Sequence, residues 1–274
     1  MLAVWMTHTI IFLHNSMAYD QPEQNDEAQT ATGIEFQPRI GEYHYDITWG
    51  GNPIGTGIVS VIREDDHYVL KAKSETIGLI DKLYRLRYMG ETRIQKEDLT
   101  PVNAIVIDED RKRKKIQEVQ YPSSSAPGST KMVETRYPKK SGEEIRIKEY
   151  EFLSEMGILD IFSAIFLARS FDWQVGEQHT FSLIIGSGQF KVIMSCIGET
   201  ELSVEGETVP VWVIRPMAFE ISEKPSPPPK RKMLVYLSAD ESRDLISLKV
   251  DLGFSSVKLH LVKYFDSDID YQVN

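Results

Sequence analysis

Cysteine is almost absent from this 274-residue sequence, and positive charge is scarce relative to negative charge. The single thiol, Cys196, allows no disulfide within the chain, and its place in the apolar run Phe190–Ile197 favours a buried, unreactive side chain. There are 31 lysines and arginines against 41 aspartates and glutamates, so the net charge is −10 at pH 7. Because nucleic acids and anionic membrane surfaces attract positive fields, we expect neither as a general partner of the chain.

Short catalytic and metal-binding motifs are also missing. The sequence contains no GxSxG elbow, P-loop, GxGxxG or HExxH motif. Its six histidines lack the spacing of metal ligands, and its acidic clusters do not follow the pattern of a calcium loop. We therefore expect no cofactor, no metal and no enzymatic activity. The alternative is a hydrolase whose catalytic groups meet only in the folded chain, because such groups need not be adjacent in sequence.

The N-terminal segment 1–18 is predicted to be a signal peptide. It contains no Asp, Glu, Lys or Arg, its centre Val4–Leu13 is mostly apolar, and Ser16-Met17-Ala18 has the small-x-small pattern of a cleavage site. The positive residues that usually open such a peptide are missing, so a misassigned start codon and a degenerate anchor are the two alternatives. Cleavage predicts an exported protein of the periplasm or cell envelope, not an integral membrane protein once processed. The polar residues 19–40 are predicted to be a disordered lead-in.

Residues 41–266 are predicted to form a single β-rich domain, with a C-terminal tail at 267–274. At its start, Tyr43, Tyr45 and Ile47 alternate with polar residues, which is typical of a strand with one buried face. The same alternation, interrupted by turn residues, predicts about a dozen strands. The expected strands are 43–49, 54–62, 67–74, 84–95, 102–107, 131–137, 145–152, 179–185, 190–197, 208–219, 233–238, 245–252 and 257–264.

Two polar segments between expected strands are interpreted as surface loops. The basic block 111–115 (RKRKK) lacks the aromatic residues and basic surroundings of a nucleic-acid site, so we expect a solvated hairpin. The proline-rich segment 223–230 favours a stiff, extended loop, with docking of a partner as the alternative.

One segment, Gly157–Trp173, is predicted to form a long helix. Ile158, Ile161 and Ile165 recur at helical spacing, and apolar residues occupy most of the circumference. Ser154 is expected to cap the N-terminus. A helix that is apolar on most sides has to be buried, and this one is too short to span a bilayer. It is either a core helix covered by a sheet, or a helix that lines or plugs the cavity of an open barrel.

Short patterns along the chain resemble one known family, the exported bacterial proteins that carry the domain of unknown function 3108. The matching patterns are Trp49–Gly55, Thr76–Leu79 followed by Leu83-Tyr84, Tyr88 with Gly90–Thr92, Asp160 with Ser163-Ala164 and Leu167–Ser170, and Leu237–Asp240. The resemblance covers about residues 41–264, within the uncertainty of strand boundaries. The sequence departs from the family pattern at Ala239, at 198–200 and at 254–256.

The resemblance implies export to the periplasm or cell envelope and an all-β fold with a helix. It implies no catalytic residues, because the family has no established activity. The expected fold is mainly β, with one curved antiparallel sheet or open half-barrel wrapped over a single long apolar helix. By analogy of architecture alone, such a fold is similar to that of periplasmic lipoprotein carriers.

The expected site is an apolar cavity between the sheet and the helix, which would bind a lipid, an acyl chain or another apolar ligand. Its expected lining is Trp49, Tyr88, Phe162, Ile165, Phe166 and Trp212, with Ser163 and Arg169 beside a polar head group. Each of these side chains could instead fill a core. In that case the alternative is an envelope protein that docks a protein partner through a sheet edge or the Pro225–Pro229 loop.

Overall fold

The computed structural model describes residues 36–123, 128–155, 157–222 and 232–267. The predicted signal peptide at 1–18, most of the lead-in at 19–40, the Pro225–Pro229 loop and all but the first residue of the tail at 267–274 lie outside the described residues.

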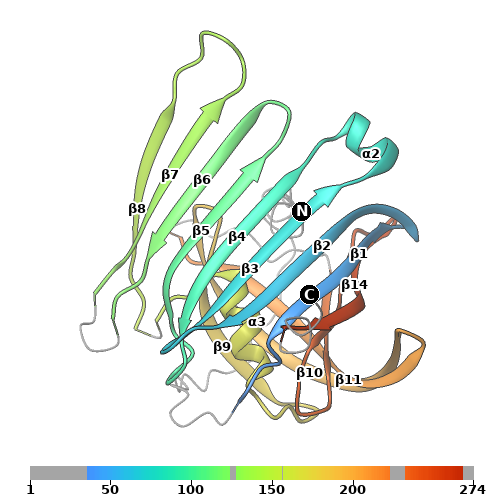
Figure 1. Ribbon diagram of the computed structural model, residues 1–274. Helices are drawn as coiled ribbons and strands as arrows, with labels where there is room; N and C mark the ends of the chain where they lie inside the picture. The colour runs from blue at the N-terminus through green and yellow to red at the C-terminus, as the bar shows by residue number, and fades with distance from the viewer. Residues whose placement is uncertain (1–35, 124–127, 156, 223–231, 268–274) are drawn as a thin grey trace.

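The described residues form fourteen β-strands and two short helices (Figure 1). The first eight strands are β1 (Gly41–Trp49), β2 (Asn52–Arg63), β3 (His67–Thr76), β4 (Arg87–Gln95), β5 (Pro101–Glu109), β6 (Arg113–Gln120), β7 (Thr130–Pro138) and β8 (Arg146–Phe152). The other six are β9 (Gln178–Ile185), β10 (Gly188–Val204), β11 (Glu207–Glu220), β12 (Met233–Ser238), β13 (Leu245–Asp251) and β14 (Ser256–Asp266). Helix α2 (Gly78–Leu83) connects β3 to β4, and α3 (Ile161–Arg169) connects β8 to β9.

All fourteen strands belong to one antiparallel sheet whose edges are β8 and β9. Strands β1 to β8 form one meander and β9 to β14 form a second. The two meanders join where β1 pairs with β14, from Gly41 opposite Asp266 to Trp49 opposite Val257. The sheet curves but does not close, and α3 lies on its concave side (Figure 1). The expectation of a mainly β fold built on one curved antiparallel sheet is therefore confirmed.

The alternation of side chains places the apolar residues on the concave face. In β1, Tyr43, Tyr45 and Ile47 are buried, whereas Glu42 and Asp46 are exposed. The main core lies among β1–β4, β9–β14 and α3. A second, smaller cluster lies beneath β5–β8 and consists of Ala104, Val119, Met132, Phe152, Ile158 and Ile184.

The prediction of one long helix over Gly157–Trp173 is wrong. Leu159 instead pairs with the edge strand β9: its amide donates to the Ser182 carbonyl over 2.9 Å, and its carbonyl accepts from the Ile184 amide over 2.9 Å. The helix begins only after Asp160 and ends at Arg169, nine residues in all. The apolar run therefore holds two elements, a short extended segment and a short helix, whose combined sequence has the periodicity of a single helix.

The N-terminus of α3 is capped by Asp160, not by Ser154 as predicted. The Asp160 carboxylate accepts from the amides of Phe162 and Ser163 over 2.8 and 3.0 Å, and the Ser163 hydroxyl accepts from the Asp160 amide over 3.0 Å. This reciprocal pair is a capping box, which satisfies amide groups that a helix start leaves unpaired. Burial raises the pKa of Asp160, and the hydrogen bonds from Ser163 and from the Tyr121 hydroxyl oppose that shift.

The basic block 111–115 is only partly a solvated hairpin. Arg111 and Lys112 lie in the turn between β5 and β6, but Arg113, Lys114 and Lys115 belong to β6. Alternation along β6 turns Lys115 to the concave face, where it is buried. The prediction of a solvated hairpin is therefore wrong for Lys115, because the strand begins within the basic run.

Candidate functional site

Helix α3 packs across the concave face of both meanders. Its Phe166 ring contacts Phe36 and Tyr68, with ring centroids 5.7 and 5.4 Å apart. Its Phe162 ring lies over Gly90 of β4, where a Cβ atom would come within 2.5 Å of the ring. Gly90 therefore allows α3 to approach the sheet at this point.

An apolar pocket of about 120 Å³ lies between α3 and the sheet. Strands β1–β4, β13 and β14 form its wall, and α3 covers it. Its lining is mostly apolar and comprises Tyr45, Ile47, Gly57, Ile58, Val59, Val61, Leu70, Ala72, Lys73, Ser74, Tyr88, Ile161, Phe162, Ile165, Phe166, Arg169, Leu245, Leu248 and Leu259. Five of the eight residues predicted for the site, Tyr88, Phe162, Ile165, Phe166 and Arg169, thus border one pocket.

A second pocket of about 50 Å³ shares Tyr88, Ile161 and Phe162 with the first. It is more polar, because the pairing of β4, β5 and β6 aligns Tyr88, Asp108 and Lys115 in one row across the sheet. Burial lowers the pKa of Lys115, and the neighbouring carboxylates of Asp108 and Glu134 oppose that shift. Phe162 and Tyr88 therefore stand between the first pocket and a smaller one whose lining includes charged side chains.

Other polar side chains close the second pocket through specific contacts. The Tyr121 hydroxyl donates to Asp160 over 3.1 Å, and the Gln117 amide donates to Glu134 and to the Gly186 carbonyl, each over 3.0 Å. Burial raises the pKa of Tyr121 well above its usual value, so its hydroxyl stays protonated and acts as a donor.

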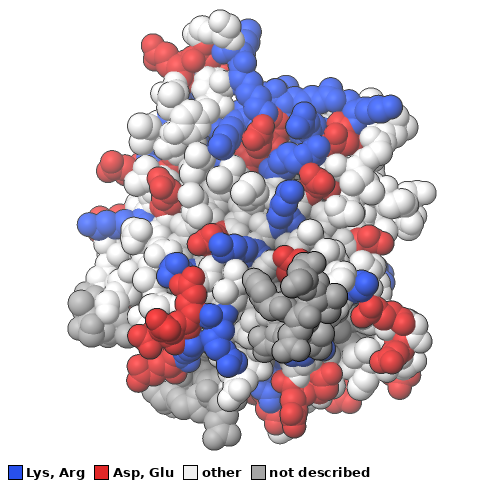
Figure 2. Space-filling model, in the orientation of Figure 1, with Lys and Arg blue, Asp and Glu red and all other residues white. Residues whose placement is uncertain are grey.

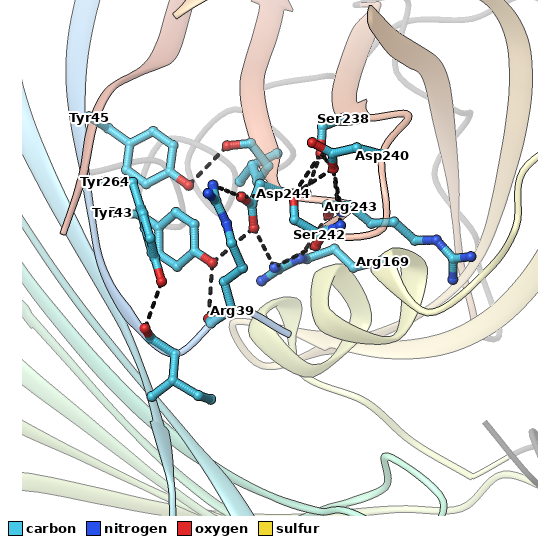
Figure 3. Close-up of polar contacts among 12 residues, drawn as sticks. Arg39, Tyr43, Tyr45, Arg169, Ser238, Asp240, Ser242, Arg243, Asp244 and Tyr264 are labelled. Carbon is cyan, nitrogen blue, oxygen red and sulfur yellow. Dashed lines mark hydrogen bonds and ion pairs between the residues drawn. The ribbon is translucent and has the colours of Figure 1, made fainter. Parts of the chain in front are cut away.

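Arg169, predicted to meet a ligand head group, is engaged in a buried network at the C-terminus of α3 (Figure 3). Its guanidinium donates to the carbonyls of Arg243 and Ser242 over 2.9 and 3.1 Å and to the Asp244 carboxylate over 2.7 Å. The Tyr43 hydroxyl also donates to Asp244, over 2.8 Å, and Arg39 forms an ion pair with the same carboxylate. Arg169 thus anchors α3 to the turn between β12 and β13, which leaves it fewer donors for a ligand.

The remaining predicted site residues line neither pocket. Ser163 is fully buried in the capping box of α3. Trp212 is buried in β11 as part of the main core. Trp49 is exposed at the end of β1. Trp212 therefore occupies a core position and not a pocket wall.

Sequence reasoning missed Asp108, Lys115 and Asp244. A signal for the first two was present, because a hairpin centred on the basic turn pairs Asp108 with Lys115 and turns both to one face. No local signal marked Asp244, whose partners Arg39 and Arg169 are distant in sequence. Within the ranges that the structure describes, no cluster of three or more His, Cys, Asp or Glu could hold a metal ion, and no helix could span a membrane.

Comparison with known proteins adds one family and two solved structures. A family model described as protein of unknown function (DUF3108) matches residues 44–262. No curated protein matches the chain. A crystal structure of a β-barrel-like protein of domain of unknown function DUF1849 from Brucella abortus is similar with a TM-score of 0.56 and 11% identity, over 85% of this chain and 100% of that one. The structure of a candidate lipoprotein from Parabacteroides distasonis matches 86% of this chain and 100% of that one, with a TM-score of 0.33 and 8% identity.

Proposed function

The chain belongs to the DUF3108 family, and from that premise we propose that it is an exported, non-enzymatic protein of the cell envelope that binds an apolar group beneath α3. The observation that carries this proposal is the apolar pocket of about 120 Å³ between α3 and β1–β4. A filled core would leave no such space, since protein interiors normally pack without voids much larger than a water molecule.

The size of the pocket limits the ligand. An engineered apolar cavity of about 150 Å³ stays dry and accepts benzene, whereas sites for drug-sized ligands hold about 300–1,000 Å³. At about 120 Å³, this pocket suits a group of benzene size or the end of an acyl chain. A whole long-chain lipid would need α3 to move away from the sheet, against the capping box at one end and the Arg169 network at the other.

The charged side chains that line the second pocket, beside Phe162, support an amphiphilic ligand over a pure hydrocarbon. Lys115 and Asp108 lie on the far side of Phe162 and Tyr88 from the apolar lining. Only a few polar groups are needed to orient a ligand whose bulk is apolar. The proposed ligand therefore has a short apolar part beneath α3 and a small polar part toward Lys115.

Benzene binding tests the apolar pocket. A ligand at ten times its Kd adds about 1.4 kcal/mol to the free energy of unfolding, which corresponds to about 3–6 °C in a domain of this size. We expect benzene to raise the melting temperature of the protein by such an amount. Ile165→Trp should abolish the increase, because the larger side chain fills the pocket that Ile165 borders.

The matched control is Val175→Trp, an exposed position that borders neither pocket. It should keep the full response to benzene. The absence of any response in the unaltered protein, or an equal response in the Ile165→Trp variant, would contradict binding at this site. Decanoic acid, run in parallel, shows whether a ten-carbon chain enters the same pocket.

A further inference from the structure

Helix α2 and its C-cap residue expose three large apolar side chains at one end of the sheet. Leu79, Leu83 and Tyr84 are 70%, 68% and 69% exposed, and no residue of α2 is buried. Single exposed apolar residues are common on protein surfaces, but three of them within six positions form an apolar patch of the kind that marks an interaction site. Ile145, in the connection between β7 and β8, is a further exposed apolar residue at this end.

The neighbouring turns belong to the same end of the molecule. Antiparallel order brings the turn between β5 and β6 and the connection between β7 and β8 to the end that α2 occupies (Figure 1). Contact is direct for the first of these, because the Arg111 guanidinium donates to the carbonyls of Asp81 and Lys82 in α2. We call this surface, formed by α2, 110–112 and 139–145 together with the residues that directly flank these segments, the α2 end.

Positive charge gathers at the α2 end, although the whole protein carries −10. Figure 2 shows lysine and arginine side chains concentrated in the upper part of the molecule, where these turns lie. The cations of this surface are Lys82, Arg85, Arg87, Arg111, Lys112, Arg113, Lys114, Lys139, Lys140 and Arg146, and they outnumber its carboxylates, Glu75, Asp81, Glu109, Asp110, Glu143 and Glu144.

Several of these cations are not neutralised by a carboxylate. Asp81 and Glu75 pair with Arg87, Glu109 with Lys139, and Asp110 with Arg113. A hydrogen bond from Lys139 lowers the pKa of Glu109, and the nearby charges of Lys114 and Arg85 lower it further. Of these ten described cations, seven have no carboxylate within 4 Å, namely Lys82, Arg85, Arg111, Lys112, Lys114, Lys140 and Arg146.

We propose that the α2 end docks on the surface of an anionic phospholipid bilayer. Leu79, Leu83 and Tyr84 enter the boundary between head groups and acyl chains, and the unpaired lysines contact the phosphates. A nucleic acid is a poorer fit, because such sites use aromatic side chains on which bases stack, whereas two of these three residues are leucines. The net charge of −10 does not oppose this docking, because screening confines the field of each charge to about 8–10 Å. The proposal goes beyond the ligand pocket and does not depend on it.

Vesicle co-sedimentation of the full chain tests this docking. One set of vesicles contains equal parts of phosphatidylglycerol and phosphatidylcholine, and the other contains phosphatidylcholine alone. We expect binding to the first set that weakens with added salt, and little binding to the second. The double variant Lys82→Glu/Lys112→Glu should bind the anionic vesicles at least about ten-fold more weakly, since each basic residue near such a surface contributes about five-fold. The double variant Leu79→Ser/Leu83→Ser should also bind them at least about ten-fold more weakly, because it removes the apolar side chains that enter the boundary between head groups and acyl chains.

Two exposed positions away from the α2 end serve as matched controls. Leu153, 73% exposed just after β8, is replaced by Ser, and Lys131, exposed near the start of β7, is replaced by Glu. Both lie at the opposite end of their strands from the α2 end, so both variants should bind as the unaltered protein does. Melting temperatures of all variants should be unchanged, because none of the altered side chains is buried.

Three results would overturn the proposal. The first is no binding of the unaltered protein to anionic vesicles at low salt. The second is binding that charge reversal abolishes but the serine substitutions leave intact, which would indicate an acidic macromolecule as the partner. The third is equal binding to both vesicle types that charge reversal does not change.

Discussion

Gly90 and Phe162 form a close approach between α3 and the sheet. A Cβ atom at Gly90 would meet the Phe162 ring at 2.5 Å, well inside ordinary contact. The ring also borders both the larger apolar pocket and the smaller one that contains Asp108 and Lys115. A single methyl group at this point should therefore affect both the stability of the fold and the shape of the site.

Gly90→Ala should lower the free energy of unfolding by about 1–3 kcal/mol, the usual cost of overpacking. In a Phe162→Ala background the same change should cost almost nothing, because the ring that it meets is gone. Urea unfolding of the four proteins measures this coupling. Gly198→Ala is the control, because a Cβ there meets nothing within 4 Å. Equal costs of Gly90→Ala in the two backgrounds would contradict the contact.

Helix α3 is only nine residues long, and isolated helices of that length are unstable in water. Its stability therefore depends on tertiary contacts, which include its buried face and both of its ends. Asp160 caps the first turn, and Arg169 joins the last turn to Asp244. Burial lowers the pKa of Arg169, but Asp244 and the neighbouring tyrosines raise it by more, so the guanidinium keeps its charge. Helix α3 is therefore held in place across the concave face, with the apolar pocket between it and the sheet.

Asp244→Asn should destabilise the protein by about 3–5 kcal/mol, because it leaves the buried Arg169 charge without its partner. Chemical denaturation measures the loss. Asp172→Asn is the matched control: that carboxylate is exposed and lies 3.6 Å from Arg243, so its removal should change stability by less than about 0.5 kcal/mol. If both changes cost the same small amount, the network does not anchor α3.

At the scale of the whole molecule, the sheet is open and both of its edges are protected. Strand β8 carries Arg146, Lys148, Glu149 and Glu151, and charged side chains discourage pairing with another chain. At the other edge, Leu159 pairs with Leu183 of β9. These features disfavour the alternative in which a protein partner adds a strand to a sheet edge, and they leave the α2 end as the surface better suited to docking.

Export is a prediction about the whole chain, and it rests on the uncharged apolar segment 1–18 and its small-x-small site. N-terminal sequencing of the protein recovered from its own host should begin at Tyr19. A periplasmic fraction prepared alongside a cytoplasmic marker protein provides the control. Intact Met1 on protein from the soluble cytoplasmic fraction would contradict export.

The strands and their buried faces could be predicted from sequence because their signal is local. Tyr43, Tyr45 and Ile47 alternate with polar residues within a single strand, and a side-chain period of two needs no knowledge of the partner strand. The same patterns, with the family resemblance, identified the segment that crosses the concave face. Four aromatic and aliphatic residues of the pocket, Tyr88, Phe162, Ile165 and Phe166, were predicted on that basis.

Other features depend on contacts between residues far apart in the chain, and no local pattern contains them. The helix is short because Leu159 pairs with a strand that begins nineteen positions later, at Gln178. Arg169 is an anchor and not a free head-group ligand because Asp244, 75 residues away, accepts from it. The basic α2 end forms because the curved sheet brings separate turns to one end of the molecule, so that an acidic chain presents a positive surface.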